Sequence, residues 1–278
     1  MSFQKIVLVC NPSQPLAAQS AQVLADFLHE KNCTCTILDD YKKLTADLTA
    51  DLCISLGGDG TTLRCARQCA ALDIPVLPVN CGSLGFLAAC EKHEAQTVLT
   101  DILDGKYQIH TRWLLAADIL RAGQPAIKQA LAFNDCVIKA NQPRAFTLAA
   151  QRNGQFFKQF YGDGVIVATP SGSTAYSLAA GGPIVEPQLD VWTVTSICPH
   201  SLADRALLLQ AQTELTFTPQ FKNPADRATV SLDGQENFIL QNADRVILRR
   251  AAREARLIMP KQFDFFNRLH QKLEWGTR

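Results

Sequence analysis

The turn at residues 57–60, Gly-Gly-Asp-Gly, places a carboxylate among three glycines, Gly57, Gly58 and Gly60. It follows a strand-like run at 51–56 and precedes a helical pattern at 61–72. Glycines let the backbone approach a ligand closely, and the first amides of a helix attract phosphate. Asp59 could accept a hydroxyl proton or help to hold a divalent cation. It could equally cap the helix, and the tetrapeptide alone does not separate these roles.

A second glycine-bearing turn, residues 80–86, follows the apolar run 74–79. In a parallel sheet the carboxyl ends of neighbouring strands lie at one edge, where ligands collect. We therefore expect this turn to lie beside Asp59, either as a ligand contact or as a plain connection between a strand and a helix.

The most unusual stretch runs from Tyr161 to Pro183. A strand-like run at 164–169 leads into Pro-Ser-Gly-Ser-Thr at 170–174, where hydroxyls and amides gather before a short helical segment at 173–180. Such a tract is longer than an ordinary turn needs, and it predicts a surface that binds anions or sugars.

The elements that carry these turns fall into two groups. The first hundred residues alternate between apolar runs and amphipathic segments, which is typical of a parallel sheet covered by helices. The expected strands are 5–10, 33–38, 51–56 and 74–79, and the expected helices are 16–30, 61–72 and 91–103. In the first helix, the face of Leu16, Val23, Leu24, Phe27 and Leu28 should be buried.

Residues 107–260 contain many short β-rich runs, which predict a mainly antiparallel domain. The fold class is therefore an α/β N-terminal domain, 1–104, followed by a many-stranded β domain, 105–262. The segment 263–278 should form a helix that packs back on the first domain, with Phe266, Leu269 and Leu273 on its buried face. The runs in the second domain are 114–120, 130–139, 146–150, 164–169, 191–197, 206–209, 214–218, 229–232, 245–249 and 255–259.

Composition excludes several classes of protein. The 278 residues carry 27 Lys plus Arg against 26 Asp plus Glu, so the net charge of +1 predicts neither a nucleic-acid partner nor a membrane surface. The sequence has no apolar run of roughly 18 residues and no export signal, so we expect a cytoplasmic protein with ten reduced cysteines and no structural zinc.

The sequence fingerprints of dinucleotide-binding dehydrogenases, P-loop kinases and α/β-hydrolases are missing, so these three classes of enzyme are disfavoured.

Four motifs together resemble the NAD kinases in their order and spacing: GGDG at 57–60, Asn134-Asp135, the tract DGVIVATPSGSTAYSLAAGGP at 163–183, and CPHSL at 198–202. The resemblance covers residues 5 to 260. It implies phosphorylation of the 2′-hydroxyl of the adenosine ribose of NAD, with ATP or polyphosphate as donor. It also implies a divalent metal such as Mg²⁺, and a homodimer or homotetramer. The metal ligands are not identified.

The resemblance assigns Asp59 as general base. It assigns a substrate-site position to Gly57, Gly58 and Gly60, and dinucleotide contacts to Asn134, Asp135, Tyr161, Asp163, Thr174, Ala175, Tyr176, Ser177, Leu178 and Gln235. Three positions depart from the family pattern, one of which is Ala206, where Pro is usual. Asp135 stands where Glu is usual, and Tyr161 stands where many members carry Lys or Arg, which leaves the choice of phosphate donor open. A lipid or sphingoid kinase with the same glycine turn, and a non-catalytic NAD-binding regulator, are the alternatives.

Overall fold

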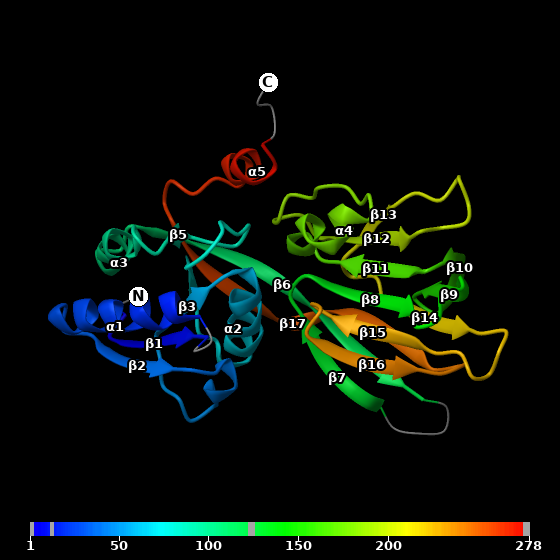
Figure 1. The fold of residues 1–278 in the computed structure, drawn as a ribbon, viewed down its shortest axis with the longest axis horizontal. Coiled ribbons are helices and arrows are strands. Elements are labelled where there is room, and N and C mark those ends of the chain that lie inside the picture. Colours follow the sequence, from blue (N-terminus) through cyan, green and yellow to red (C-terminus); the bar gives the residue numbers. More distant parts are fainter. Residues whose placement is uncertain (1–2, 12–13, 122–125, 275–278) are drawn as a thin grey trace. The chain divides into compact units, whose positions relative to one another are not determined.

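The computed structural model describes residues 3–11, 14–121 and 126–274, so the expected end of the last helix at 275–278 lies outside the described residues. The chain divides into two compact units (Figure 1). The first contains Met1–Arg112 and Arg253–Arg278, and the second contains Trp113–Ala252. Both boundaries fall inside long strands, β6 (Tyr107–Leu120) and β17 (Arg245–Pro260).

The first unit contains a parallel sheet in the order β2-β1-β3-β4, continued by the last part of β17. Its strands β1, β3 and β4 are almost wholly buried, as apolar runs in a sheet covered on both faces should be. The strands are β1 (Lys5–Cys10), β2 (Thr34–Leu38), β3 (Leu52–Gly57), β4 (Val76–Asn80) and the short β5 (Cys90–Glu91). The predicted α/β class with a parallel sheet is confirmed.

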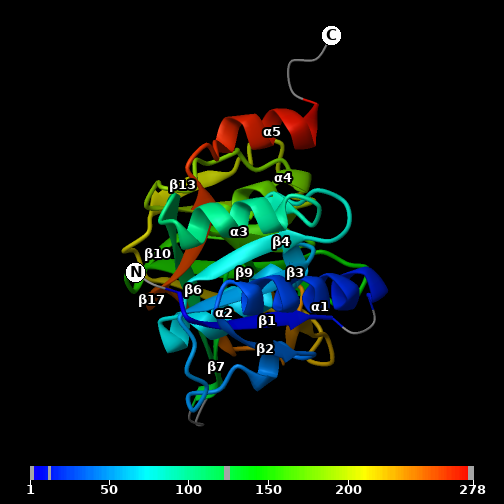
Figure 2. The same cartoon turned by 90° about the vertical axis from the view of Figure 1, so that its left-hand side faces the viewer.

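Helices cover both faces of this sheet. Figure 2 shows α1 (Pro15–Glu30) and α3 (Ala95–Leu103) on the near face, while α2 (Asp59–Leu72) lies behind the strands. A 3₁₀ turn, η1 (Tyr41–Lys43), follows β2. The strand order changes direction between β1 and β3, so their carboxyl ends form the topological switch point at which α/β folds bind ligands.

The second unit consists of two antiparallel sheets with the core between them. One sheet has the order β13-β12-β11-β8-β15-β16, and the other contains β10, β9, β14, β17, β6 and β7. Trp113 and Trp192 meet edge to face in the core with ring centroids 4.8 Å apart. The further strands are β7 (Ala126–Ala132), β8 (Asp135–Ala140), β9 (Phe146–Arg152), β10 (Gln155–Gly162), β11 (Gly164–Ala168), β12 (Val191–Ile197), β13 (Leu207–Gln210), β14 (Leu215–Gln220), β15 (Ala228–Leu232) and β16 (Glu236–Leu240).

Three expectations about strands in this unit are corrected. The run 130–139 is two strands, because Phe133 and Asn134 form a break between β7 and β8. The runs 245–249 and 255–259 are one strand, since the polar residues between them continue β17. Strands β10 and β16 were not expected, because polar and exposed side chains interrupt their apolar pattern.

The short helical segment expected at 173–180 is a 3₁₀ turn, η2 (Ser171–Thr174), followed by the four-residue helix α4 (Tyr176–Ala179). The last helix, α5 (Phe265–Leu273), belongs to the first unit. Its buried face differs from the expected one. Leu269 is buried, but Phe266 is 51% exposed, and the second buried residue is Arg268. No helix among the described ranges is both long and apolar enough to span a bilayer.

Candidate active site

Asp59 is the first residue of α2, directly after the carboxyl end of β3. Gly58 is the N-cap, and no side chain caps this helix. The Asp59 carboxylate instead accepts hydrogen bonds from the backbone N–H groups of Phe86 at 2.9 Å and Leu87 at 3.2 Å. The simple capping role is therefore wrong: Asp59 is held by the turn that follows β4.

The turn after β4 reaches Asp59 because β3 and β4 are parallel neighbours with Gly57 opposite Asn80. The two glycine-bearing turns thus lie together, as their positions in the sequence predict. Gly85 is required at the contact, since a Cβ atom there would overlap the Asp59 carboxylate. Asp59 is half-buried and Gly60, next in the helix, is exposed, so a ligand can reach both.

A cavity of about 420 Å³ opens at the same edge of the sheet, at the topological switch point. Its lining comes from the ends of β1 and β2, from η1, and from the first turns of α2. Thr61 and Arg64 of α2 line it together with Lys42, and the Arg64 guanidinium lies 5.5 Å from the ring centre of Tyr41. These cationic residues do not stand out in the sequence, because no phosphate-binding motif surrounds them.

In the second unit, Asn134 and Asp135 are fixed by Asp233. The Asp233 carboxylate accepts the backbone N–H groups of Phe133 at 2.8 Å, Asn134 at 2.7 Å and Asp135 at 3.1 Å. Asp233 and Gly234 both have positive φ, 52° and 65°, and they form the tight turn between β15 and β16. Asp233 is thus a site residue that sequence reasoning missed. The Asp-Gly pair indicates a hairpin turn, but nothing in it indicates a contact with residues a hundred positions earlier.

A second cavity, of about 450 Å³, lies over this arrangement and is lined by Asn134, Asp135, Lys139, Ala175 and Tyr176, among others. The Asn134 Oδ1 atom is buried and has no hydrogen-bond partner among the residues that the structure describes. Buried polar atoms normally have partners, so this oxygen indicates a ligand that donates a hydrogen bond. The Tyr176 ring is 40% exposed and can stack on a planar group.

Asp135 is buried beside a second carboxylate. Burial, with a smaller contribution from the charge of Asp233, raises the pKa of Asp135 to about 7. Its carboxyl group can therefore change its protonation state near neutral pH, at the wall of the cavity.

The hydroxyls of the tract after β11 are mostly engaged inside the protein. Thr169 donates to the Phe133 carbonyl at 2.7 Å and accepts from the Gly172 amide at 3.1 Å. A Cβ atom at Gly172 would overlap the Asn134 backbone, so glycine permits this close approach. The Ser177 hydroxyl pairs with Thr195 at 3.0 Å. The tract therefore packs against the backbone of Asn134. Of the dinucleotide contacts predicted in this tract, Ala175 and Tyr176 line the cavity.

Thr174 and Leu178, the remaining predicted contacts of this tract, are half-buried, and the Thr174 hydroxyl bonds to the Ser171 carbonyl at 3.2 Å. Gln235 follows the Asp233-Gly234 turn, and its backbone N–H donates to the Leu232 carbonyl at 2.9 Å. These residues flank the cavity without lining it.

Tyr161 and Asp163 lie at the other end of the sheet from Asn134 and Asp135. In the register of β11 against β8, Ala168 is opposite Asp135, while Gly164 is opposite Lys139. Asp163 is therefore about 16 Å from Asp135 along the strand direction. Tyr161 is exposed, and its ring meets His200 with centroids 4.9 Å apart.

Within the ranges that the structure describes, no group of three or more His, Cys, Asp or Glu side chains is arranged to hold a metal ion. A Mg²⁺ ion that is bound with a nucleotide does not need such a group, because phosphates and water supply most of its ligands.

Comparisons with known proteins agree for both units. Residues 39–107 match the ATP-NAD kinase N-terminal domain, and residues 133–259 match the ATP-NAD kinase C-terminal domain. The chain is 40% identical over 230 residues to an NAD kinase of Geobacter metallireducens, which covers 82% of this chain and 80% of that protein. It is 34% identical over 290 residues to an NAD kinase of Citrifermentans bemidjiense, covering 99% and 100%.

Two crystal structures share the fold. A yeast NADH kinase in complex with NADH superimposes with a TM-score of 0.88 at 23% identity, covering all of this chain and 89% of the other. An NAD kinase of Archaeoglobus fulgidus in complex with ATP gives a TM-score of 0.78 at 20% identity, covering 97% and 98%.

Proposed function

The chain belongs to the NAD kinase family, and we propose that Asp59 is the general base with which it phosphorylates the 2′-hydroxyl of the adenosine ribose of NAD. One observation carries the proposal. The Asp59 carboxylate does not cap its own helix and is held by the amides of Phe86 and Leu87, just after the carboxyl end of β3. A carboxylate oxygen has more than one acceptor direction, so these two bonds leave room for a substrate hydroxyl.

In the proposed reaction, the ribose 2′-hydroxyl donates a hydrogen bond to Asp59. Its oxygen attacks the terminal phosphorus of ATP, the bond to the β-phosphate oxygen breaks, and the proton passes to the carboxylate. NADP and ADP are formed. Phosphoryl transfer depends chiefly on positioning and on neutralising the oxygen charges. A fixed base is useful because a ribose hydroxyl is a weak nucleophile near neutral pH.

We place the dinucleotide in the cavity of the second unit. The unpartnered Asn134 Oδ1 would accept a hydrogen bond from a base or carboxamide NH₂ group, and Tyr176 would lie against a planar ring. The lining includes Lys139, Thr229 and Ser231, whose polar groups can form hydrogen bonds with a dinucleotide. The family assignment gives no support to a lipid kinase or to a silent NAD-binding regulator.

We place the phosphate donor at the switch-point cavity of the first unit. Thr61 and Arg64 lie in the first turns of α2, where free amides and the helix dipole favour phosphate, and Lys42 adds a second cation. When bound, Mg²⁺ would neutralise the charge of the donor phosphates. An Arg64→Ala variant should then raise KM for ATP more than KM for NAD.

Tyr161 and Asp163 lie at the far end of β11 from Asn134. Asp163 precedes Gly164, which is opposite Lys139, a residue that lines the cavity. The resemblance assigns NAD contacts to both residues. A homodimer or homotetramer in the cytoplasm is the assembly that we propose.

The test is an assay of NADP formation from NAD, ATP and Mg²⁺, repeated with polyphosphate as donor. Asp59→Asn should lower kcat by at least about a hundredfold while NAD affinity changes only a few-fold. Asp73→Asn is the matched control, because Asp73 ends the same helix in a left-handed conformation that Asn accepts readily. An Asp59→Asn variant that keeps more than about a tenth of the parental kcat would contradict the base assignment.

A further inference from the structure

Arg268 is an unusual residue for the buried face of a helix. It lies on α5, whose start is capped by Asp264 accepting the Asn267 amide at 2.8 Å. Its side chain is only 9% exposed, and Leu269 beside it is fully buried. Burying a cation is costly unless it is paired or hydrogen-bonded, so the contacts of Arg268 need an explanation.

The guanidinium of Arg268 reaches the turn that holds Asp59. It donates a hydrogen bond of 2.9 Å to the carbonyl oxygen of Ala88, which is 180 positions away in sequence. Ala88 follows Phe86 and Leu87, whose amides bind the Asp59 carboxylate. One turn further along α5, the Lys272 Nζ lies 5.6 Å from the ring centre of Phe86. The helix thus contacts this turn at two points.

The charges around Arg268 also connect this residue with Asp59. Burial lowers the pKa of Arg268, but the nearby carboxylates of Asp59, Glu91 and Glu94 oppose this effect. The guanidinium therefore lies within electrostatic range of Asp59 and faces a local excess of negative charge.

We propose that Arg268 is a positioning residue for phosphoryl transfer, which acts by fixing the segment Phe86–Ala88 so that its amides hold the Asp59 carboxylate toward the substrate. The proposal rests on the role of Asp59 proposed above. A catalytic group that is misplaced by about 1 Å can lose about a hundredfold in rate, so loss of this anchor should affect kcat rather than NAD binding.

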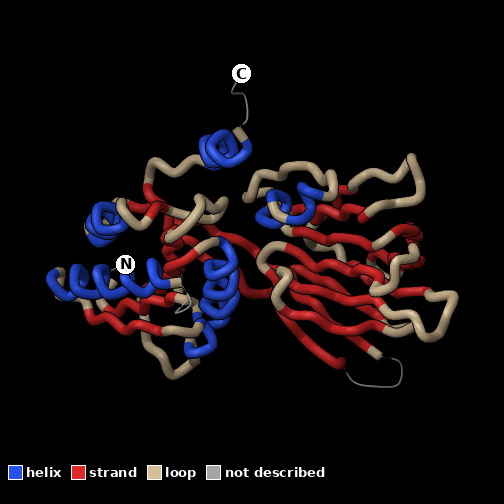
Figure 3. Tube along the Cα trace, in the orientation of Figure 1, coloured by secondary structure: helices blue, strands red, loops and turns tan. Residues whose placement is uncertain are grey.

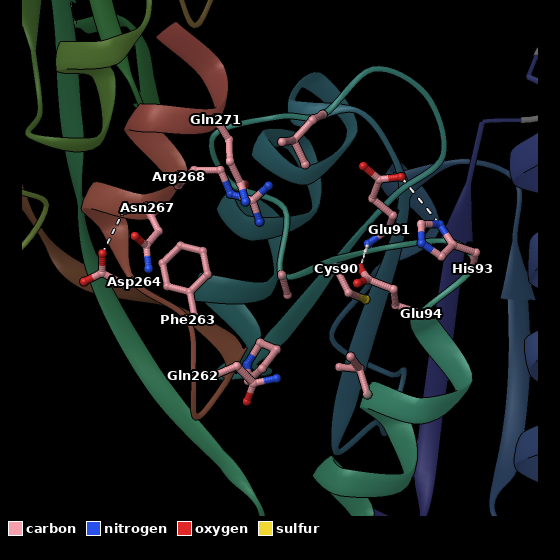
Figure 4. Close-up of a pocket in the computed structure, with 14 residues that line it drawn as sticks. Cys90, Glu91, His93, Glu94, Gln262, Phe263, Asp264, Asn267, Arg268 and Gln271 are labelled. Carbon is pink, nitrogen blue, oxygen red and sulfur yellow. Dashed lines mark hydrogen bonds and ion pairs between the residues drawn. The ribbon is translucent and has the colours of Figure 1, made fainter. Parts of the chain in front are cut away.

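The structure also provides a way to restore the missing group. Figure 4 shows Arg268 and Gln271 projecting from α5 toward a cavity of about 500 Å³, with Cys90–Glu94 on the opposite side. If Arg268 is shortened to Ala, this cavity gives a small guanidinium ion a path to the vacated position. Glu91 and Glu94 also line the cavity and would attract the ion.

The principal experiment compares Arg268→Met with the parent protein. Met fills much of the same space but cannot donate to Ala88 or carry charge. We expect kcat to fall about tenfold or more, with KM for NAD within about threefold of the parent. The matched control is Gln271→Ala, an exposed residue on the same helix and cavity wall, which should retain parental kinetics.

Chemical rescue separates positioning from mere stabilisation. Millimolar guanidinium chloride should raise the kcat of Arg268→Ala several-fold and leave the parent and Gln271→Ala unchanged. A general loss of stability would not be repaired in this way, because guanidinium weakens folded proteins. If the Arg268→Met variant does not fold, Arg268→Lys is the variant to measure. It should fold, because it retains a cationic donor. Its kcat should be clearly below that of the parent, and its KM for NAD should be unchanged.

A double-mutant cycle distinguishes failure of this inference from failure of the proposed function. If Arg268 acts through Asp59, Arg268→Met should lower kcat much less in an Asp59→Asn background than in the parent. A folded Arg268→Met variant with the kcat of the parent would overturn the inference and leave the role of Asp59 intact. If Arg268→Met does not fold, the same result with Arg268→Lys would overturn it. An active Asp59→Asn variant would instead overturn the proposed function itself.

Discussion

Asp59 and Asp135 show how different surroundings suit two carboxylates to different tasks. Asp59 is half-buried and bound by two backbone amides at a strand end, with access for a ligand. Asp135 is buried against the negative charge of Asp233, and its pKa is raised to about 7. The first arrangement suits proton transfer with substrate, whereas the second makes the cavity wall sensitive to pH.

Asp135→Asn should change the pH dependence of stability. Because the folded-state pKa of Asp135 is raised, the folded protein retains a proton that the unfolded chain has lost, and stability falls as pH rises from about 4 to about 7. Asn cannot ionise, so the variant does not lose this stability. The free energy of unfolding of the variant, relative to that of the parent, should therefore increase by roughly 2 kcal/mol when the pH is raised from about 5 to about 8. Urea unfolding at both pH values measures this difference.

The control for this measurement is Asp26→Asn, which changes an exposed carboxylate on α1. It is measured at the same two pH values. If the stability of Asp135→Asn differed from that of the parent by the same amount at both, the raised pKa of Asp135 would be refuted.

At the scale of single residues, the sequence predicts the local part of the site and misses the long-range part. Asp59 stands out because three glycines, a preceding strand and a following helix are all neighbours in the chain. Its partners Phe86 and Leu87 are ordinary residues whose roles arise only from folding, and so is Arg268, which donates to the carbonyl next to them. Asp233 is missed for the same reason.

At the scale of elements, helix α1 shows where periodicity misleads. The large apolar residues Leu16 and Val23 are about half exposed, while Ala17, Ala21 and Ala25 are buried. Small side chains let a helix approach the flat face of a sheet closely, so they can form the contact surface in place of larger ones. The helix itself was predicted almost to the residue, because its overall amphipathic pattern is local.

The β15–β16 hairpin has a function beyond closing the sheet, since its turn residue Asp233 holds the Phe133–Asp135 backbone. Asp233→Asn keeps a residue that tolerates positive φ but loses the charge that three N–H groups share. We expect KM for NAD to rise several-fold with kcat nearly unchanged, as steady-state kinetics can measure. Asp226→Asn, in the loop before β15, is the control. An unchanged KM for NAD in Asp233→Asn would show that the hairpin does not organise this cavity.

At the scale of the whole molecule, all ten cysteines are free thiols, as their spread through apolar runs predicts. Cys198 is exposed and has a left-handed φ of 45°, whereas eight of the others are buried and Cys35 is half-buried. Burial also raises the pKa of Cys35 to about 11 and that of Cys90 to about 12, which keeps these thiols protonated and unreactive.

Thiol titration of the native protein should therefore show one fast thiol, and Cys198→Ser should remove it. Titration of the denatured, unreduced protein should find all ten thiols. Thiols missing in pairs would indicate disulfides and would contradict this assignment.

The division into units is the global feature that the sequence indicates least well. The change in composition near Gly105 marks where β-rich segments begin, but the boundary lies inside β6, at Arg112. The return boundary likewise lies inside β17, because a strand that continues without a break gives no local signal. The fold class can be predicted from the sequence because it depends on the alternation of many elements. A domain boundary, in contrast, depends on the contacts of a single strand.

The first unit is assembled from two stretches of chain, with the whole second unit between them in sequence. During synthesis, Asp59 and the turn that holds it emerge early, the cavity of the second unit follows, and the helix with Arg268 emerges last. Units generally fold as they emerge during synthesis. A nascent chain thus contains the proposed base, and the cavity in which we place NAD, before it contains the anchor that we assign to Arg268. Full kinase activity should begin only once α5 has left the exit tunnel.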